Sequence, residues 1–132
     1  MHIDSFEIVL CDMKNFKKYT IISIVYSIAI FILSASPRLG GGIEFPFFDK
    51  ILHFIAFMIL AFLLIRAIKE NSSTNKYIFY TIIISALYGI SLEVVQYYIP
   101  GRECNFWDWI ADFVGTLVGI FISIPRVRLH NK

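Results

Sequence analysis

The chain has 132 residues, of which 58% are hydrophobic and only 17% are charged, and its mean hydropathy is +0.70. A soluble domain carries roughly 25% charged residues, so this composition excludes a soluble enzyme, a disordered tail and a disulfide scaffold. It indicates a protein that lies in lipid, with room for about four spans of roughly 20 residues. The net charge of +2 is too small to indicate nucleic-acid binding.

Charged residues divide the chain into four long apolar segments, 19–37, 51–65, 77–92 and 113–125. Only the first can cross the membrane unaided, because the others cover roughly 20–24 Å of a hydrocarbon core of about 30 Å. Each of the other three must therefore include polar residues at one end. The second span extends back to Asp49, the third continues through Glu93 to Tyr98, and the fourth starts near Trp107.

Segments outside the spans have simpler interpretations. Residues 1–18 mix acidic, basic and apolar side chains, which does not match a signal peptide and predicts a short helix on the membrane surface. Residues 19–125 form the four-span domain, and residues 126–132 form a basic tail. The glycine-rich segment 34–42 and the pair Pro100-Gly101 predict loops.

The loop charges predict the orientation. If the loops alternate between the two sides, one side holds nine basic and four acidic residues, and the other holds three basic and six acidic residues. The positive-inside rule then places both termini in the cytoplasm. Cys11 and Cys104 fall on opposite sides, so they cannot form a disulfide within one chain.

Each span has one stripe of small and polar residues at helical spacing, which predicts an all-α four-helix transmembrane bundle. The fourth stripe covers a sector of roughly 60°, and its two glycines allow another helix to approach closely. The stripes, in chain order, are Ser23, Ser27 and Ser34; Asp49, His53, Ala56 and Leu60; Ser85, Gly89, Glu93 and Gln96; and Asp108, Asp112, Gly115 and Gly119.

The ionisable groups of three stripes lie at the outer ends of their helices. Because a charge in hydrocarbon costs several kcal/mol, such groups face a bundle interior or a wet cavity. We therefore expect one outward-facing pocket lined by Asp49, Lys50, His53, Glu93, Gln96, Arg102, Asp108 and Asp112. Around it lie aromatic residues that fit a ligand rim or a headgroup belt equally well: Phe45, Phe47, Phe48, Tyr97, Tyr98, Phe106, Trp107 and Trp109.

These motifs, in this order, resemble the VanZ-like family of bacterial membrane proteins over residues 19–124. The resemblance rests on the end of the first span at Ser34 to Pro37, on Asp49-Lys50-x-x-His53-Phe54, on Glu93-x-x-Gln96, on Pro100-Gly101-Arg102, and on Asp108-x-x-x-Asp112-x-x-Gly115-x-x-x-Gly119. It implies an integral protein of the cytoplasmic membrane and a link to resistance against the glycopeptide teicoplanin, the phenotype of the founding member. Asp112 departs from the pattern, because the family often has Asn there.

The residue types leave several chemistries open, and whether the protein is an enzyme stays open with them. His53 with Asp49 is a candidate general base, and Glu93 or Asp108 is a candidate acid or metal ligand. Glu93, Asp108 and Asp112 together are candidates to hold a divalent cation, because hard cations bind clustered carboxylates. The alternative is an interhelical salt-bridge network in which Lys50 and Arg102 pair with these acids.

Three functions follow as hypotheses. The first is a site for an amphiphile such as a lipid-linked cell-envelope precursor or a lipoglycopeptide, in which Arg102 and Lys50 bind phosphate or carboxylate and Gln96 and the acids bind sugar or amide groups. The second is proton or ion transport, which would require a homo-oligomer because four helices enclose little space. The third is a structural membrane module without a ligand.

Overall fold

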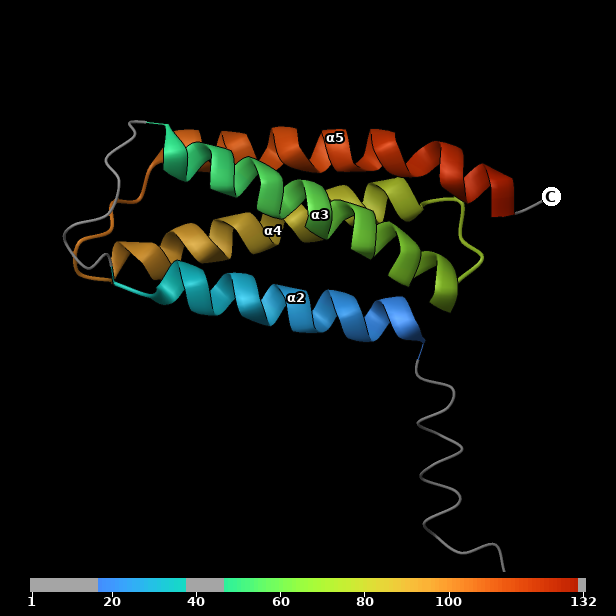
Figure 1. Cartoon of the computed structure of the whole chain (residues 1–132), viewed down its shortest axis with the longest axis horizontal. Helices are drawn as coiled ribbons and strands as arrows, with labels where there is room; N and C mark the ends of the chain where they lie inside the picture. The colour runs from blue at the N-terminus through green and yellow to red at the C-terminus, as the bar shows by residue number, and fades with distance from the viewer. Residues whose placement is uncertain (1–16, 38–46, 131–132) are drawn as a thin grey trace, which may run out of the picture.

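The computed structural model describes residues 17–37 and 47–130, with side chains described as far as residue 124. Four helices run alternately up and down: α2 (Lys18–Ala35), α3 (Phe48–Asn71), α4 (Tyr77–Tyr97) and α5 (Phe106–His130). Figure 1 shows α2 and α5 on opposite sides of the bundle, with α3 and α4 between them. We call the end where α2 and α4 finish and α3 and α5 begin the site end, and the opposite end the basic end.

All four helices are long and apolar enough to cross a membrane, with the fourth span covering Phe106–Ile124. The three short apolar segments do reach full length by including polar residues, as predicted: α3 begins before Asp49, α4 includes Glu93, and α5 begins before Asp108. The bundle of transmembrane helices is therefore confirmed. α5 continues through Pro125 to His130, so the segment expected to be a basic tail begins as part of this helix. The expected surface helix in 1–18 lies almost entirely outside the described residues.

The closest helix pair is α3 with α5, and two glycines make this contact possible. A Cβ atom on Gly115 would overlap the backbone carbonyl oxygen of Phe54, and one on Gly119 would overlap that of Met58 and lie 2.9 Å from the Cβ of Ala61. The two helix backbones are thus in direct contact, as the spacing of the glycines predicts.

The apolar interior is small and the apolar exterior is large, which is the arrangement that lipid favours. Two buried clusters form the core, one of Ile30, Phe57, Leu60 and Leu92, and one of Ala61, Ile65 and Ile120. Many large apolar side chains face outward instead, including Val25, Leu33, Leu87 and Phe121. Since lipid surrounds such side chains favourably, packing and polar contacts between helices hold the bundle together.

Interactions at the basic end connect α2 to α3. The carboxylate of Glu70 accepts hydrogen bonds from the backbone N–H groups of Tyr19 (2.9 Å) and Thr20 (3.3 Å) in the first turn of α2, and the N–H of Thr20 also donates to the carbonyl of Lys17 (3.1 Å). The guanidinium of Arg66 lies over the rings of Tyr19 and Phe62. These contacts fix the start of α2 at the basic end. The ionisable residues of the stripes lie at the opposite end, the site end.

The glycine contact gives the first prediction. Gly115→Ala forces α3 and α5 apart, because the added Cβ cannot share the space of the Phe54 carbonyl, and overpacking of this kind costs about 2 kcal/mol. We expect the free energy of unfolding in bicelles to fall by about that amount. Ala29→Val adds bulk at an exposed position of α2 and serves as the control. Equal stability of the two variants would contradict the close contact.

Candidate functional site

Acidic side chains open both helices that begin at the site end. Asp49 lies in the first turn of α3 and Asp108 in the first turn of α5, where the positive end of the helix dipole favours a carboxylate. A Lys50 Nζ to Asp108 Oδ1 distance of 3.2 Å makes an ion pair between the two helices, and Arg102 Nη1 lies 3.9 Å from Asp49 Oδ1. Both acids at this outer level therefore have a basic partner.

One turn deeper, a buried hydrogen bond connects α3 with α5. The Nδ1 atom of His53 and the Oδ1 atom of Asp112 are 2.8 Å apart, and the two residues are 8% and 2% exposed. The sequence suggested Asp49 as the acid that orients His53, since it lies one turn away on the same helix. In the structure Asp112 makes the hydrogen bond to Nδ1 instead, because the glycine contact brings α5 against this face of α3.

Glu93, buried in the penultimate turn of α4, positions the start of α5. Its Oε2 atom accepts a hydrogen bond from the backbone N–H of Asn105 (3.0 Å), and the Oδ1 atom of Asn105 accepts one from the backbone N–H of Trp107 (3.0 Å). Asn105 is therefore the N-terminal capping residue of α5. It was not among the predicted site residues, although an Asn just before an apolar helix is a known capping signal.

Arg102 follows a tight turn and reaches across to α2. Gly101 has a φ of 78°, which favours glycine, and the backbone N–H of Arg102 donates to the carbonyl of Ile99 (3.1 Å), so Pro100 and Gly101 occupy the centre of a β-turn as predicted. The guanidinium donates to the carbonyls of Leu33 (3.1 Å) and Ser36 (3.2 Å). It thereby satisfies carbonyls at the C-terminus of α2, and an ion pair with Glu93 is not formed.

Three buried polar atoms in this region have no hydrogen-bond partner among the described residues: Glu93 Oε1, Asp112 Oδ2 and Gln96 Nε2. The unpaired oxygen of Asp112 faces α4, because a Cβ on Gly89 would lie 3.2 Å from it. An unsatisfied buried polar group is costly and uncommon, so each such atom needs a physical explanation.

The candidate metal ligands gather around His53 in two groups. One contains Asp49, His53 and Asp108, and the other contains His53, Glu93 and Asp112; in each group one ligand atom per residue lies within 4.8 Å of the others. The set expected from the sequence, Glu93, Asp108 and Asp112, is thus divided between the two groups. We call the second, fully buried group the inner triad.

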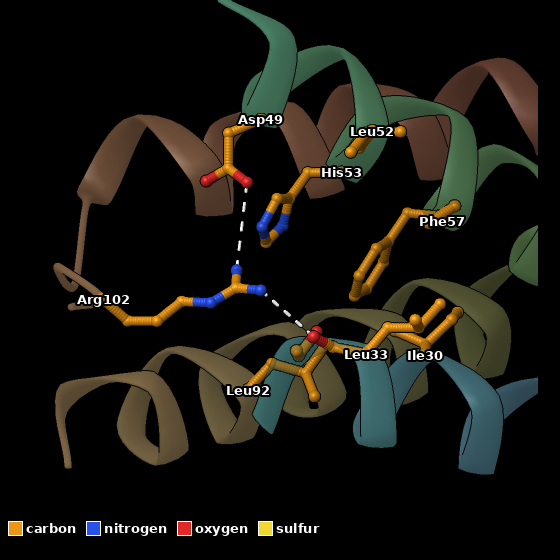
Figure 2. A pocket seen from close by; sticks show the side chains of 10 residues that line it. Ile30, Leu33, Asp49, Leu52, His53, Phe57, Leu92 and Arg102 are labelled. Carbon is orange, nitrogen blue, oxygen red and sulfur yellow. Dashed lines mark hydrogen bonds and ion pairs between the residues drawn. The ribbon is translucent and has the colours of Figure 1, made fainter. Parts of the chain in front are cut away.

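A cavity of about 170 Å³ lies beside these groups, between α2 and α3 (Figure 2). Its wall is mostly apolar, and Asp49, His53 and Arg102 provide its polar end. Leu33 and Leu52 also line it although they are 69% and 48% exposed, so the cavity reaches the lipid-facing surface of the bundle. Its lining residues are Ile30, Leu33, Ser34, Asp49, Leu52, His53, Ala56, Phe57, Leu92 and Arg102.

Comparison with known proteins decides the family. The VanZ/LLP1 family model matches residues 5–128, nearly the whole chain. The chain belongs to the VanZ/LLP1 family. No curated protein and no solved structure matches it.

In this VanZ/LLP1 protein the motifs that carried the resemblance converge at the site end. Asp49, Lys50 and His53 come from α3, Glu93 and Gln96 from the last turns of α4, Arg102 from the following turn, and Asp108 and Asp112 from α5. Gln96 is 1% exposed and points into the bundle. The aromatic residues Phe47, Phe48, Tyr97, Tyr98, Phe106 and Trp107 remain exposed, while Trp109 is half-buried and Phe45 lies outside the described residues.

In this VanZ/LLP1 protein the loop between α4 and α5 also carries an exposed thiol, that of Cys104. Its pKa is raised above the ordinary value, first by desolvation and then by the nearby carboxylates of Glu93 and Asp108. A thiol with a raised pKa is a poor nucleophile near neutral pH, because the thiolate is the reactive form. Cys104 is therefore a useful probe position rather than a catalytic candidate.

Proposed function

We propose that this VanZ/LLP1 protein binds the anionic headgroup of an amphiphile that enters from the outer leaflet. The ligand class is a lipid-linked cell-envelope precursor, another lipid or a lipoglycopeptide. One observation carries the proposal: the cavity combines an apolar wall that reaches the lipid-facing surface with a polar end where Arg102 lies. A single amphiphile needs both kinds of surface at once.

The chemistry of the polar end supports an anion. A guanidinium can bind a phosphate or carboxylate through two parallel hydrogen bonds, and Figure 2 shows the guanidinium of Arg102 projecting between Asp49 and the end of α2. Lys50 supplies a second cation at the same level. In this proposal Gln96, Asp112 and the other acids contact sugar or amide groups, and His53 is the candidate base, with Asp49, Glu93 or Asp108 assisting, if a reaction takes place.

The charge distribution supports an outward-facing site in the cytoplasmic membrane. Basic residues are concentrated at the basic end: Lys17 and Lys18 at the start of α2, Arg66 and Lys69 in the last turns of α3, Lys76 just before α4, and Arg126 and Arg128 in the last turns of α5. Under the positive-inside rule this end faces the cytoplasm together with both termini. The cavity then opens on the extracytoplasmic side, where cell-envelope precursors and glycopeptides are found.

A structural role is the second candidate, and a specific observation favours it. Lys50–Asp108 and His53–Asp112 both connect α3 with α5, and Arg102 satisfies the C-terminus of α2. These contacts would stabilise the bundle without any ligand. The two roles differ in whether loss of the Arg102 charge changes ligand binding or only stability.

Arg102→Gln is expected to weaken binding of a polyprenyl phosphate at least about tenfold, because one charge-assisted contact contributes about 1.5–3 kcal/mol. Binding is measured by native mass spectrometry of the protein released from nanodiscs. The uncharged polyprenol has the same tail and is expected to bind weakly to both proteins. Arg66→Gln removes the same side chain at the basic end and should leave phosphate binding unchanged.

Thermal unfolding of each variant separates binding from folding, and Arg102→Lys provides a variant that keeps the charge. Teicoplanin susceptibility of a sensitive bacterial host, at equal membrane abundance, tests the resistance link with the same variants. The proposal is contradicted if wild type does not prefer the phosphate over the alcohol. If wild type shows no such preference, and Arg102→Gln lowers the unfolding temperature without changing lipid binding, the structural role is supported.

The orientation is tested at Cys104 in a Cys11→Ser background. A membrane-impermeant thiol reagent should label Cys104 in intact cells, and the rate should rise with external pH. Because the thiol pKa is raised, the half-maximal rate is expected at a higher pH than for an ordinary exposed cysteine, and Glu93→Gln should lower it. Labelling that requires permeabilised cells would reverse the proposed orientation.

A further inference from the structure

The inner triad shares His53 with the polar end of the cavity, but its two acids, Glu93 and Asp112, do not line the cavity. His53, Glu93 and Asp112 are 8%, 6% and 2% exposed, and they come from three different helices. One ligand atom of each lies within 4.8 Å of the other two. An imidazole and two carboxylates therefore share a small volume from which lipid and bulk water are excluded.

The charges of this volume are not balanced by fixed cations. The outer acids Asp49 and Asp108 have Arg102 and Lys50 as partners. Within the described part of the chain, Glu93 and Asp112 have no Lys or Arg partner, and the ion pair of Asp112 is with His53 alone. Two buried carboxylates beside one imidazole leave excess negative charge, which is costly in a medium of low dielectric constant.

Unused ligand atoms give a second, independent indication. Oε1 of Glu93 and Oδ2 of Asp112 are buried without a hydrogen-bond partner among the described residues. The other oxygen of each carboxylate is already used, by the backbone N–H of Asn105 and by His53. Each carboxylate is thus held in place through one oxygen and presents the other without a partner.

We propose that the inner triad binds one divalent transition-metal ion, with His53, Glu93 and Asp112 as protein ligands. A divalent ion balances the two carboxylates and has one imidazole nitrogen and one oxygen of each acid within reach. One imidazole nitrogen with two carboxylate oxygens suits Zn²⁺ or Mn²⁺ better than Mg²⁺, which favours an all-oxygen shell rich in water. Metal–ligand bonds of about 2.0–2.2 Å require the three ligand atoms to draw together slightly.

This site does not use Arg102 or Lys50, the cations proposed to bind the headgroup, although its three residues are also the ones proposed above to contact sugar or amide groups or to act as a base. Metal binding is measured without any amphiphile, so its failure is distinguishable from a failure of headgroup binding at Arg102. It also gives Asp112 a defined role: its carboxylate supplies a negative charge, and an oxygen that binds a divalent ion more strongly than a neutral amide oxygen does.

The test uses full-length protein with Cys11→Ser and Cys104→Ser and without a polyhistidine tag, so that thiols and tag cannot bind the probe. After treatment with a chelator and desalting, the protein is titrated with Zn²⁺ by isothermal calorimetry, and bound metal is counted by mass spectrometry. We expect about one Zn²⁺ per chain and a higher unfolding temperature in its presence, since a ligand that binds only the folded state stabilises it. Mg²⁺ at the same concentration should have little effect.

Glu93→Gln and Asp112→Asn are expected to weaken Zn²⁺ binding by at least about 100-fold, because even residues that only orient a ligand contribute about 10–100-fold. The amide oxygen introduced by Glu93→Gln can still accept the hydrogen bond from Asn105, so this variant is expected to fold. Asp49→Asn is the matched comparison: it removes a charge from the other group around His53 and should weaken Zn²⁺ binding far less than Glu93→Gln does, because Asp49 supplies no ligand to the proposed site.

Two results would overturn the proposal: the first needs no variant, and the second is read only from variants whose thermal unfolding shows that they are folded. The first is wild-type protein that binds neither Zn²⁺ nor Mn²⁺ and shows no thermal shift, in which case protons balance the inner carboxylates. The second is stoichiometric binding that Asp49→Asn abolishes and Glu93→Gln retains, which would move the ion to the other group of ligands.

Discussion

The direct backbone contact between α3 and α5 determines the arrangement of the polar site. Gly115 lies against the carbonyl of Phe54, the residue after His53, and Asp112 lies almost one turn before Gly115. Once the two backbones touch, the imidazole and the carboxylate must meet, and their 2.8 Å hydrogen bond follows. The same contact expels lipid from the interface, which is why His53 and Asp112 are buried although their helices are otherwise surrounded by exposed apolar side chains.

The bundle tolerates buried polar groups at the site end because most of them have a polar partner. These groups form an outer and an inner layer. The outer layer pairs acids with Lys50 and Arg102, close to the helix ends, where the cost of a charge is lower than at the membrane centre. The inner layer depends on His53, and its two carboxylates retain one unpaired oxygen each. This gradient from paired to unpaired groups makes the outer layer suitable for recognising a headgroup and the inner layer suitable for an ion. The cavity between α2 and α3 brings the lipid-facing surface to the same end.

Helical periodicity and helix length were enough to predict the four spans, the inward stripes and the residues that gather at the site end. The pairing within the cluster could not be predicted, because His53 has Asp49 one turn away on its own helix and Asp112 across an interface whose rotation only the packed glycines define. The reach of Arg102 to α2 depends on the turn at Pro100-Gly101, whose direction in space the sequence pattern leaves open. The cavity depends on which side of α3 is covered by α2, a property of packing rather than of any single helix.

A double-mutant cycle measures directly whether α3 and α5 meet through a buried His53–Asp112 pair. Unfolding free energies in bicelles are compared for wild type, His53→Ala, Asp112→Ala and the double variant, with Ser123→Ala as a distant partner on α5 for His53→Ala. We expect a coupling energy of at least about 1 kcal/mol for His53 with Asp112 and none for His53 with Ser123. Additivity of His53→Ala and Asp112→Ala within about 0.5 kcal/mol would contradict it.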